Sequence, residues 1–170
     1  METESVKLYT LNFKEIKAYF FSFLFVLGNI ALPQIFHLMS LGGKIFLPIY
    51  FFTLIAAYKY GWKVGLLTAI LSPLVNSALF GMPLLMFLPV VLGKSVLLSI
   101  SAGFSAQYFK RISIPILLGV VLFYQFFGSF IEWAFVKDFN LAVYDFRIGI
   151  PGMLLQIFGG FFVIRFLIRK

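Results

Sequence analysis

One stretch decides the fold of this chain: SPLVNSALFGMPLLMFLPVVLGKSV, Ser72–Val96. It is almost entirely apolar, yet it holds Asn76, Gly81, Lys94 and three prolines. A soluble surface would carry far more charge, and a simple lipid-facing anchor has no use for a buried amide, a buried ammonium or repeated proline. We interpret the stretch as two membrane helices joined by a tight Gly-Met-Pro turn at 81–83, with polar groups held in the membrane for a purpose.

The composition of the whole chain points to the same solvent. Its 170 residues are 62% hydrophobic and only 12% charged, and the mean hydropathy is +1.03. A soluble domain is about a quarter charged, so the bilayer is the expected environment. A spanning helix needs about 20 residues, which leaves room for at most about six or seven spans and no separate soluble domain. The chain has no cysteine, so disulfides and thiolate metal sites are excluded.

We predict an all-α membrane protein with six transmembrane helices. A cytoplasmic or interfacial segment, 1–17, precedes a single six-helix domain, 18–170. The segment has acidic residues and lacks the pattern of a cleavable signal peptide. The spans are predicted at 18–39, 45–58, 64–80, 84–108, 114–136 and 148–168, with a polar loop at 137–147 and Pro89 inside the fourth span. The third span carries a small-residue face for close helix packing, formed by Gly65, Ala69, Ser72 and Asn76.

The distribution of basic residues predicts the orientation. With both termini in the cytoplasm, three Lys or Arg fall on outer segments, and Lys94 lies within a span. Ten fall on inner segments: Lys7, Lys14, Lys17, Lys59, Lys63, Lys110, Arg111, Arg165, Arg169 and Lys170. Such a bias is typical of cytoplasmic loops, so the net charge of +8 does not indicate a nucleic-acid partner.

In this orientation the polar residues of several spans gather toward the outer face. They are Gln34 and His37 in the first span, Lys44 and Tyr50 at the outer start of the second, Asn76 in the third, Lys94 in the fourth, and Glu132 and Trp133 in the fifth. The inner halves are plainer and richer in small residues. This pattern predicts a pocket that is open to the outside and closed below by packed helices.

Lys94 is the strongest candidate for a pocket residue. It lies about ten residues from the turn, roughly 15 Å along a helix, which is too far for its stem to reach the interface comfortably. It could form a structural ion pair with Glu132, or it could face an anionic group of a ligand; the two could also alternate.

The remaining polar residues leave alternatives open. His37 could meet lipid headgroups or act in the pocket, and Asn76 could cap its helix end or contact a ligand. A single histidine without cysteine or a nearby carboxylate is a poor metal site, so no metal or cofactor is expected. The chain has no phosphate-binding loop and no constellation that pairs a nucleophile with a base, so we do not expect an enzyme.

The stretches HLMSLGGKIFLP, 37–48, and GWKVGLLTAILSPLVNSALFGMP, 61–83, resemble the substrate-binding S components of energy-coupling factor (ECF) transporters. The resemblance covers roughly residues 31–103. It implies a six-helix protein that binds a vitamin or related micronutrient near the outer face of the plasma membrane. It also implies docking on a transmembrane T component and two ATPase subunits. The family's small-xxx-small docking motif on the first span corresponds to Ala18 and Ser22.

The first hypothesis is therefore a multi-pass binding subunit for ATP-driven import of a small water-soluble vitamin. Transport would then depend on the partner subunits, since this chain lacks an ATPase motif. The rival hypothesis is an intramembrane enzyme, or a small membrane assembly or scaffold protein, which uses Lys94 and Glu132 in chemistry or packing.

Overall fold

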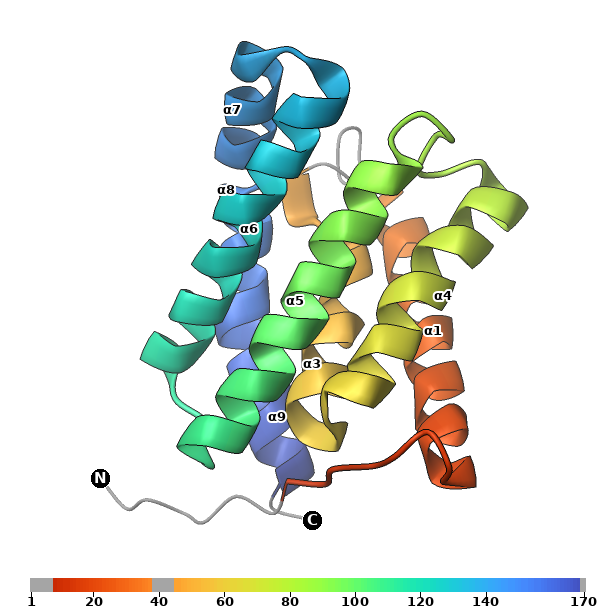
Figure 1. The fold of residues 1–170 in the computed structure, drawn as a ribbon, viewed down its shortest axis with the longest axis vertical. Helices are drawn as coiled ribbons and strands as arrows, with labels where there is room; N and C mark the ends of the chain where they lie inside the picture. The colour runs from red at the N-terminus through yellow and green to blue at the C-terminus, as the bar shows by residue number, and fades with distance from the viewer. Residues whose placement is uncertain (1–7, 38–44, 169–170) are drawn as a thin grey trace.

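The computed structural model describes residues 8–37, with His37 in its backbone only, and 45–168, and these residues are helical without a strand. Figure 1 shows the helices gathered in one bundle with their long axes roughly vertical. The elements are α1 (Ile16–His37), η1 (Pro48–Tyr50), α3 (Phe51–Tyr60), α4 (Trp62–Phe80), α5 (Leu88–Phe109), α6 (Ile114–Val136), α7 (Phe139–Ile148), α8 (Ile150–Leu154), η2 (Leu155–Gly159) and α9 (Gly160–Ile168).

Five helical segments are long and apolar enough to cross a membrane. They are Ile16–Phe36, Trp62–Phe80, Leu88–Phe109, Ile114–Val136 and Ile150–Ile168. They correspond to five of the six predicted spans. Five helices of this length and composition indicate a multi-pass membrane protein. Most of their large apolar side chains point outward, as expected where the surrounding medium is lipid rather than water.

The second predicted span is shorter than the others and lies at the centre of the bundle. The helix α3 has ten residues, about 15 Å, and it is preceded by the single turn η1. Eight of those ten residues are buried, because α3 contacts α1, α4, α5 and α9. In Figure 1, α3 and α9 lie behind α4 and α5, which agrees with these contacts.

Small residues allow α3, α4 and α5 to approach closely. A Cβ atom added to Gly65 would lie 2.4 Å from Ala57 Cβ and 2.6 Å from Ser99 Oγ, so only glycine fits between the three helices. The predicted small-residue face of the third span is confirmed, since Gly65, Ala69, Ser72 and Asn76 are all buried.

The turn between the third and fourth spans is longer than predicted. The helix α4 ends at Phe80 and is capped by Gly81, which has the left-handed φ of 68° that glycine adopts readily, and α5 begins only at Leu88. Pro89 therefore stands in the first turn of α5, where its missing N–H is tolerated, and not inside the span. Residues 81–87 form the connection, and Ser77 Oγ donates a hydrogen bond to Pro83 O.

The predicted polar loop at 137–147 is largely a helix. The side chain of Asp138 accepts a hydrogen bond from Leu141 N at 3.1 Å and caps α7. The last span then runs through α8, the π-helical turn η2 and α9 without a break.

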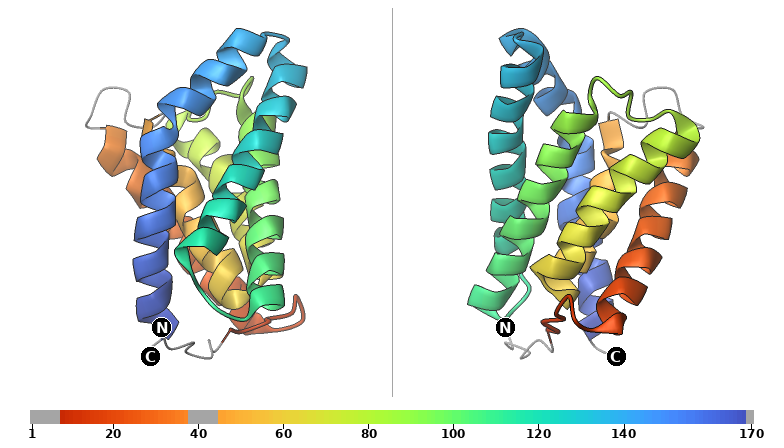
Figure 2. Two further views of the ribbon diagram at one scale, coloured as in Figure 1. Left: turned by 90° about the vertical axis from the view of Figure 1, so that its left-hand side faces the viewer. Right: turned by 45° about the vertical axis from the view of Figure 1, so that its right-hand side comes forward.

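The two ends of the bundle differ in charge. Figures 1 and 2 show α7 and the 81–87 connection at one end, and the ends of α5 and α9 at the other. Segment 8–15 joins the second end, where Tyr9 N donates to Lys59 O at 3.0 Å. That end holds seven of the described Lys and Arg residues: Lys14, Lys17, Lys59, Lys63, Lys110, Arg111 and Arg165. The end with α7 holds Lys137 and Arg147, together with Lys94 inside the helices.

Candidate functional site

A cavity of about 520 Å³ lies at the α7 end of the bundle. Its walls come from α1, η1, α4, the 81–87 connection, α5, α6 and α7. Most of the lining is apolar: Pro33, Leu47, Pro48, Ile49, Met82, Pro83, Leu84, Phe87, Val90 and Val91. The polar lining residues are Gln34, Tyr50, Asn76, Lys94, Gln125, Glu132 and Asp145. A cavity of this size, with a few polar groups in an apolar wall, is typical of a site for a small organic molecule.

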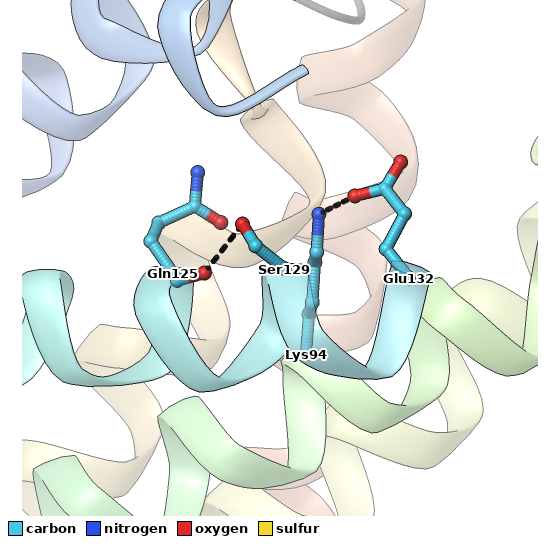
Figure 3. A network of polar contacts seen from close by, with 4 residues as sticks. All are labelled: Lys94, Gln125, Ser129 and Glu132. Carbon is cyan, nitrogen blue, oxygen red and sulfur yellow. Dashed lines mark hydrogen bonds and ion pairs between the residues drawn. The ribbon is translucent and has the colours of Figure 1, made fainter. Parts of the chain in front are cut away.

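An ion pair joins α5 to α6 at the edge of this cavity. Lys94 Nζ lies 2.5 Å from Glu132 Oε2, and both side chains are almost fully buried. Figure 3 shows the ammonium of Lys94 directed to the carboxylate of Glu132, on the same side of α6 as the amide of Gln125. Of the two roles predicted for Lys94, the structure shows the ion pair.

Gly128 allows the stem of Lys94 to reach this position. A Cβ atom added to Gly128 would lie 2.5 Å from Lys94 Cγ and 3.1 Å from Cε. The aliphatic stem therefore crosses α6 where α6 has no side chain. A larger residue at 128 would displace the ammonium from Glu132.

A buried hydrogen-bond network centred on Asn29 ties α1 to α3 and α4. Asn29 Nδ2 donates to Thr53 Oγ1 and to Ser72 Oγ, both at 3.0 Å, and Asn29 Oδ1 accepts from Phe52 N at 3.1 Å. Asn76 extends the network, since its Nδ2 donates to the carbonyl oxygens of Asn29 and Ser72. Asn76 thus links α1 to α4, and it also lines the cavity.

Two buried acceptor oxygens at the cavity have no hydrogen-bond donor among the described residues. They are Gln125 Oε1 and Asp145 Oδ1. Gln125 is only 1% exposed. Asp145 comes from α7 and lies close enough to Glu132 for the two side chains to interact. A buried polar atom without a partner is rare in native structures and typically marks a place where water, an ion or a ligand binds.

Five of the seven predicted pocket residues line one cavity: Gln34, Tyr50, Asn76, Lys94 and Glu132. Trp133 does not line it; its side chain is 44% exposed and packs edge to face against Phe139. The reason is its place in the helix, one residue after the inward-facing Glu132 and so turned about 100° away. The side chain of the seventh, His37, lies outside the described residues, as does Lys44, which was also predicted at this end.

The sequence prediction missed Gln125 and Asp145. Gln125 was visible as an amide in the middle of an apolar span, a position where polar side chains usually face the bundle interior. Asp145 gave no such signal, because a carboxylate in a polar segment is ordinarily solvated.

The pair predicted to form a docking surface, Ala18 and Ser22, packs inside the chain. Ala18 has no exposed surface, and Ser22 is 2% exposed. Ser22 Oγ donates to Ala18 O at 2.7 Å and reaches Val64 O of α4 at 3.3 Å. The small residues let α1 approach α4, so in this arrangement they are covered by the chain itself.

Comparisons with protein-family models, with curated proteins and with solved structures gave no match to this chain. The resemblance to S components therefore rests on the two stretches of sequence alone.

Proposed function

We propose that this chain is a membrane-embedded substrate-binding subunit, an S component of an ECF-type importer, that captures a small water-soluble vitamin or related micronutrient. The observation that carries the proposal is the cavity of about 520 Å³ at one end of the bundle. The Lys94–Glu132 pair and two acceptor oxygens that have no donor among the described residues lie at its wall. The apolar lining of the cavity offers a small molecule a surface to pack against, and the polar groups offer it directional hydrogen bonds.

The packing of the bundle supports a binding site rather than a channel. The Asn29 network joins α1, α3 and α4 next to the cavity. Beyond it, the close approach of α3, α4 and α5 around Gly65 leaves no space even for a methyl group. A molecule that enters the cavity would be held there until the bundle moves as a whole or the helices separate.

The charge asymmetry supports a cavity that faces out of the cell. Seven described Lys and Arg residues cluster at the end opposite to the cavity, and cytoplasmic loops are the ones enriched in such residues. In this orientation the five long helices, completed by η1 and α3 as a sixth crossing, have both termini inside. The membrane is then the plasma membrane, and the site receives its substrate from the outside.

The absence of cysteine makes the orientation directly measurable. Met82 is exposed at the cavity end, and Tyr108 is exposed at the opposite end. A membrane-impermeant maleimide added to intact cells should label Met82→Cys, whereas Tyr108→Cys should react only after the cells are permeabilised. The reverse pattern would overturn the proposed orientation.

The partners are tested by purification from the native host in a mild detergent. A T component and two ATPase subunits should accompany the tagged chain, and ATP-driven uptake should require all of them. If the chain purifies without an ATPase under conditions that preserve other membrane complexes, it is not the binding subunit of such an importer.

A further inference from the structure

The charged groups at the cavity do not balance. Among the described lining residues, one ammonium, Lys94, faces two carboxylates, Glu132 and Asp145. Lys94 is already paired with Glu132 at 2.5 Å, and Gly128 leaves the path of its stem open toward that partner. The second carboxylate, Asp145, lies beside Glu132 and has no cation of its own among the described lining residues.

Hydrogen-bond acceptors at the cavity are also in excess of the donors that reach them among the described residues. Asp145 Oδ1 and Gln125 Oε1 are both buried acceptors, and neither has a donor among the described residues. Gln125 has its main-chain oxygen bonded to Ser129 Oγ at 2.9 Å, but its side-chain oxygen is free. A buried acceptor without a donor costs about 1–3 kcal/mol. A ligand that donates N–H groups to these two oxygens would remove this cost and would bind more tightly for that reason.

The size of the cavity indicates what kind of cation fits. A bare metal ion would occupy a small fraction of about 520 Å³, and no group of three His, Asp or Glu side chains among the described residues could hold one. The apolar residues Leu47, Val91 and Phe87 also line the cavity. An organic molecule with an apolar or aromatic body and a charged nitrogen suits a wall that is mostly apolar and carries a few polar groups.

From this arrangement we infer that the ligand of the cavity carries a cationic nitrogen with N–H donors, which binds Asp145 and Gln125, and not an anionic group that binds Lys94. This inference rests on the proposed binding function and narrows it to organic cations. It also replaces the predicted role of Lys94: the ammonium holds Glu132 in place, while α7 supplies the carboxylate that recognises the ligand.

The test compares three probes that share one ring and differ in charge: 4-fluorobenzylamine, 4-fluorobenzyl alcohol and 4-fluorobenzoate. Their binding to the purified chain in uncharged detergent is followed by fluorine NMR at neutral pH. The amine, protonated under these conditions, should bind about tenfold or more tightly than the benzoate, with the alcohol between them.

Asp145→Asn should remove this preference for the amine. Asp138→Asn is the matched control, because it removes a carboxylate from the other end of α7, outside the cavity, and asparagine still caps the helix. The control should keep the preference of the native chain. If both variants lose the preference for the amine equally, the amine responds only to the net charge at this end of the bundle. That result would overturn the inference.

The outcomes separate the inference from the proposed function. Tighter binding of the benzoate, lost in Lys94→Met, would overturn the cation inference and leave a binding subunit for anionic molecules. If none of the three probes binds, the cavity does not admit a ring of this size, and both the inference and the proposed site fail. A preference for the amine that survives Asp145→Asn would place the cation elsewhere in the chain.

Discussion

Lys94→Met should destabilise the chain strongly, because it removes one partner of a buried ion pair. In the structure Lys94 Nζ lies 2.5 Å from Glu132 Oε2, and the side chains are only 10% and 3% exposed. The substitution keeps most of the volume of the stem that passes Gly128, so it tests the charge rather than the packing. It leaves Glu132 beside Asp145 with no cation among the described residues that line the cavity.

The size of the effect follows from this burial. Removal of one partner of a buried pair costs about 3–5 kcal/mol, since the other charge is left uncompensated. For a chain of this length, each kcal/mol lowers the Tm by about 2–4 °C, so Lys94→Met should lower the Tm by about 6–20 °C. Replacing both partners with apolar residues, Lys94→Met with Glu132→Met, should recover most of this loss, because no unpaired charge of the pair remains.

The assay is thermal unfolding of the ligand-free chain in detergent, followed by tryptophan fluorescence. Lys17→Met is the control, since Lys17 is an exposed lysine at the opposite end of the bundle. The double variant completes a mutant cycle, which isolates the coupling between the two residues. If Lys94→Met melts within about 2 °C of the control, or if the double variant melts as low as the single one, the pair does not stabilise the fold as the structure indicates.

Two further substitutions test the packing around the site. Gly128→Ala should lower the stability by about 1–3 kcal/mol and weaken ligand binding, because its Cβ would lie 2.5 Å from Lys94 Cγ. The control is Gly119→Ala in the same helix, where a Cβ meets nothing within 4 Å, and this variant should melt no lower than the native chain. Equal effects of the two alanines would refute the crossing of α6 by the Lys94 stem. Ala18→Leu should lower the Tm of the isolated chain, because Ala18 has no exposed surface. The control Tyr19→Leu, on the exposed side of the helix, should leave the Tm unchanged. If Ala18→Leu leaves the Tm unchanged but abolishes ATPase binding, Ala18 has the predicted docking role instead.

The positions of the long helices could be predicted from the sequence because hydrophobic length alone determines them. Runs of about 20 apolar residues bounded by basic or glycine-containing turns correspond to the five long segments, with boundaries that differ by a few residues. Boundaries were least predictable near proline: Pro89 reads as part of an apolar run, but proline favours the first turn, and α5 begins there.

The short helices were predicted less well, because tertiary packing and not hydrophobic length determines them. α3 has ten residues and is central because α1, α4, α5 and α9 surround it. α7 reads as a loop from its polarity, although Asp138 followed by Leu141 and Ala142 has the pattern of a helix start. Recognition of that cap would have placed Asp145 on a helix, but not against Glu132.

The candidate site was predicted where a polar residue interrupts an apolar span. Lys94, Glu132 and Asn76 are costly in a membrane unless they face the interior, so their burial follows from physical chemistry alone. The direction of a neighbouring side chain does not follow from the same reasoning. Trp133 was therefore predicted in the pocket, whereas in the structure it points outward. Contacts between distant segments, such as that of Asp145 with Glu132, require the folded arrangement.

Native mass spectrometry of the chain purified from its own host tests most directly whether the cavity holds a small molecule. The intact chain should carry one bound organic molecule, and Val91→Trp, which places a large side chain in the cavity, should lose it. Leu122→Trp on the exposed face of α6 is the control and should retain it. A native chain that carries no small molecule, or a bound molecule that Val91→Trp retains as fully as Leu122→Trp, would contradict the proposal that this cavity is the binding site.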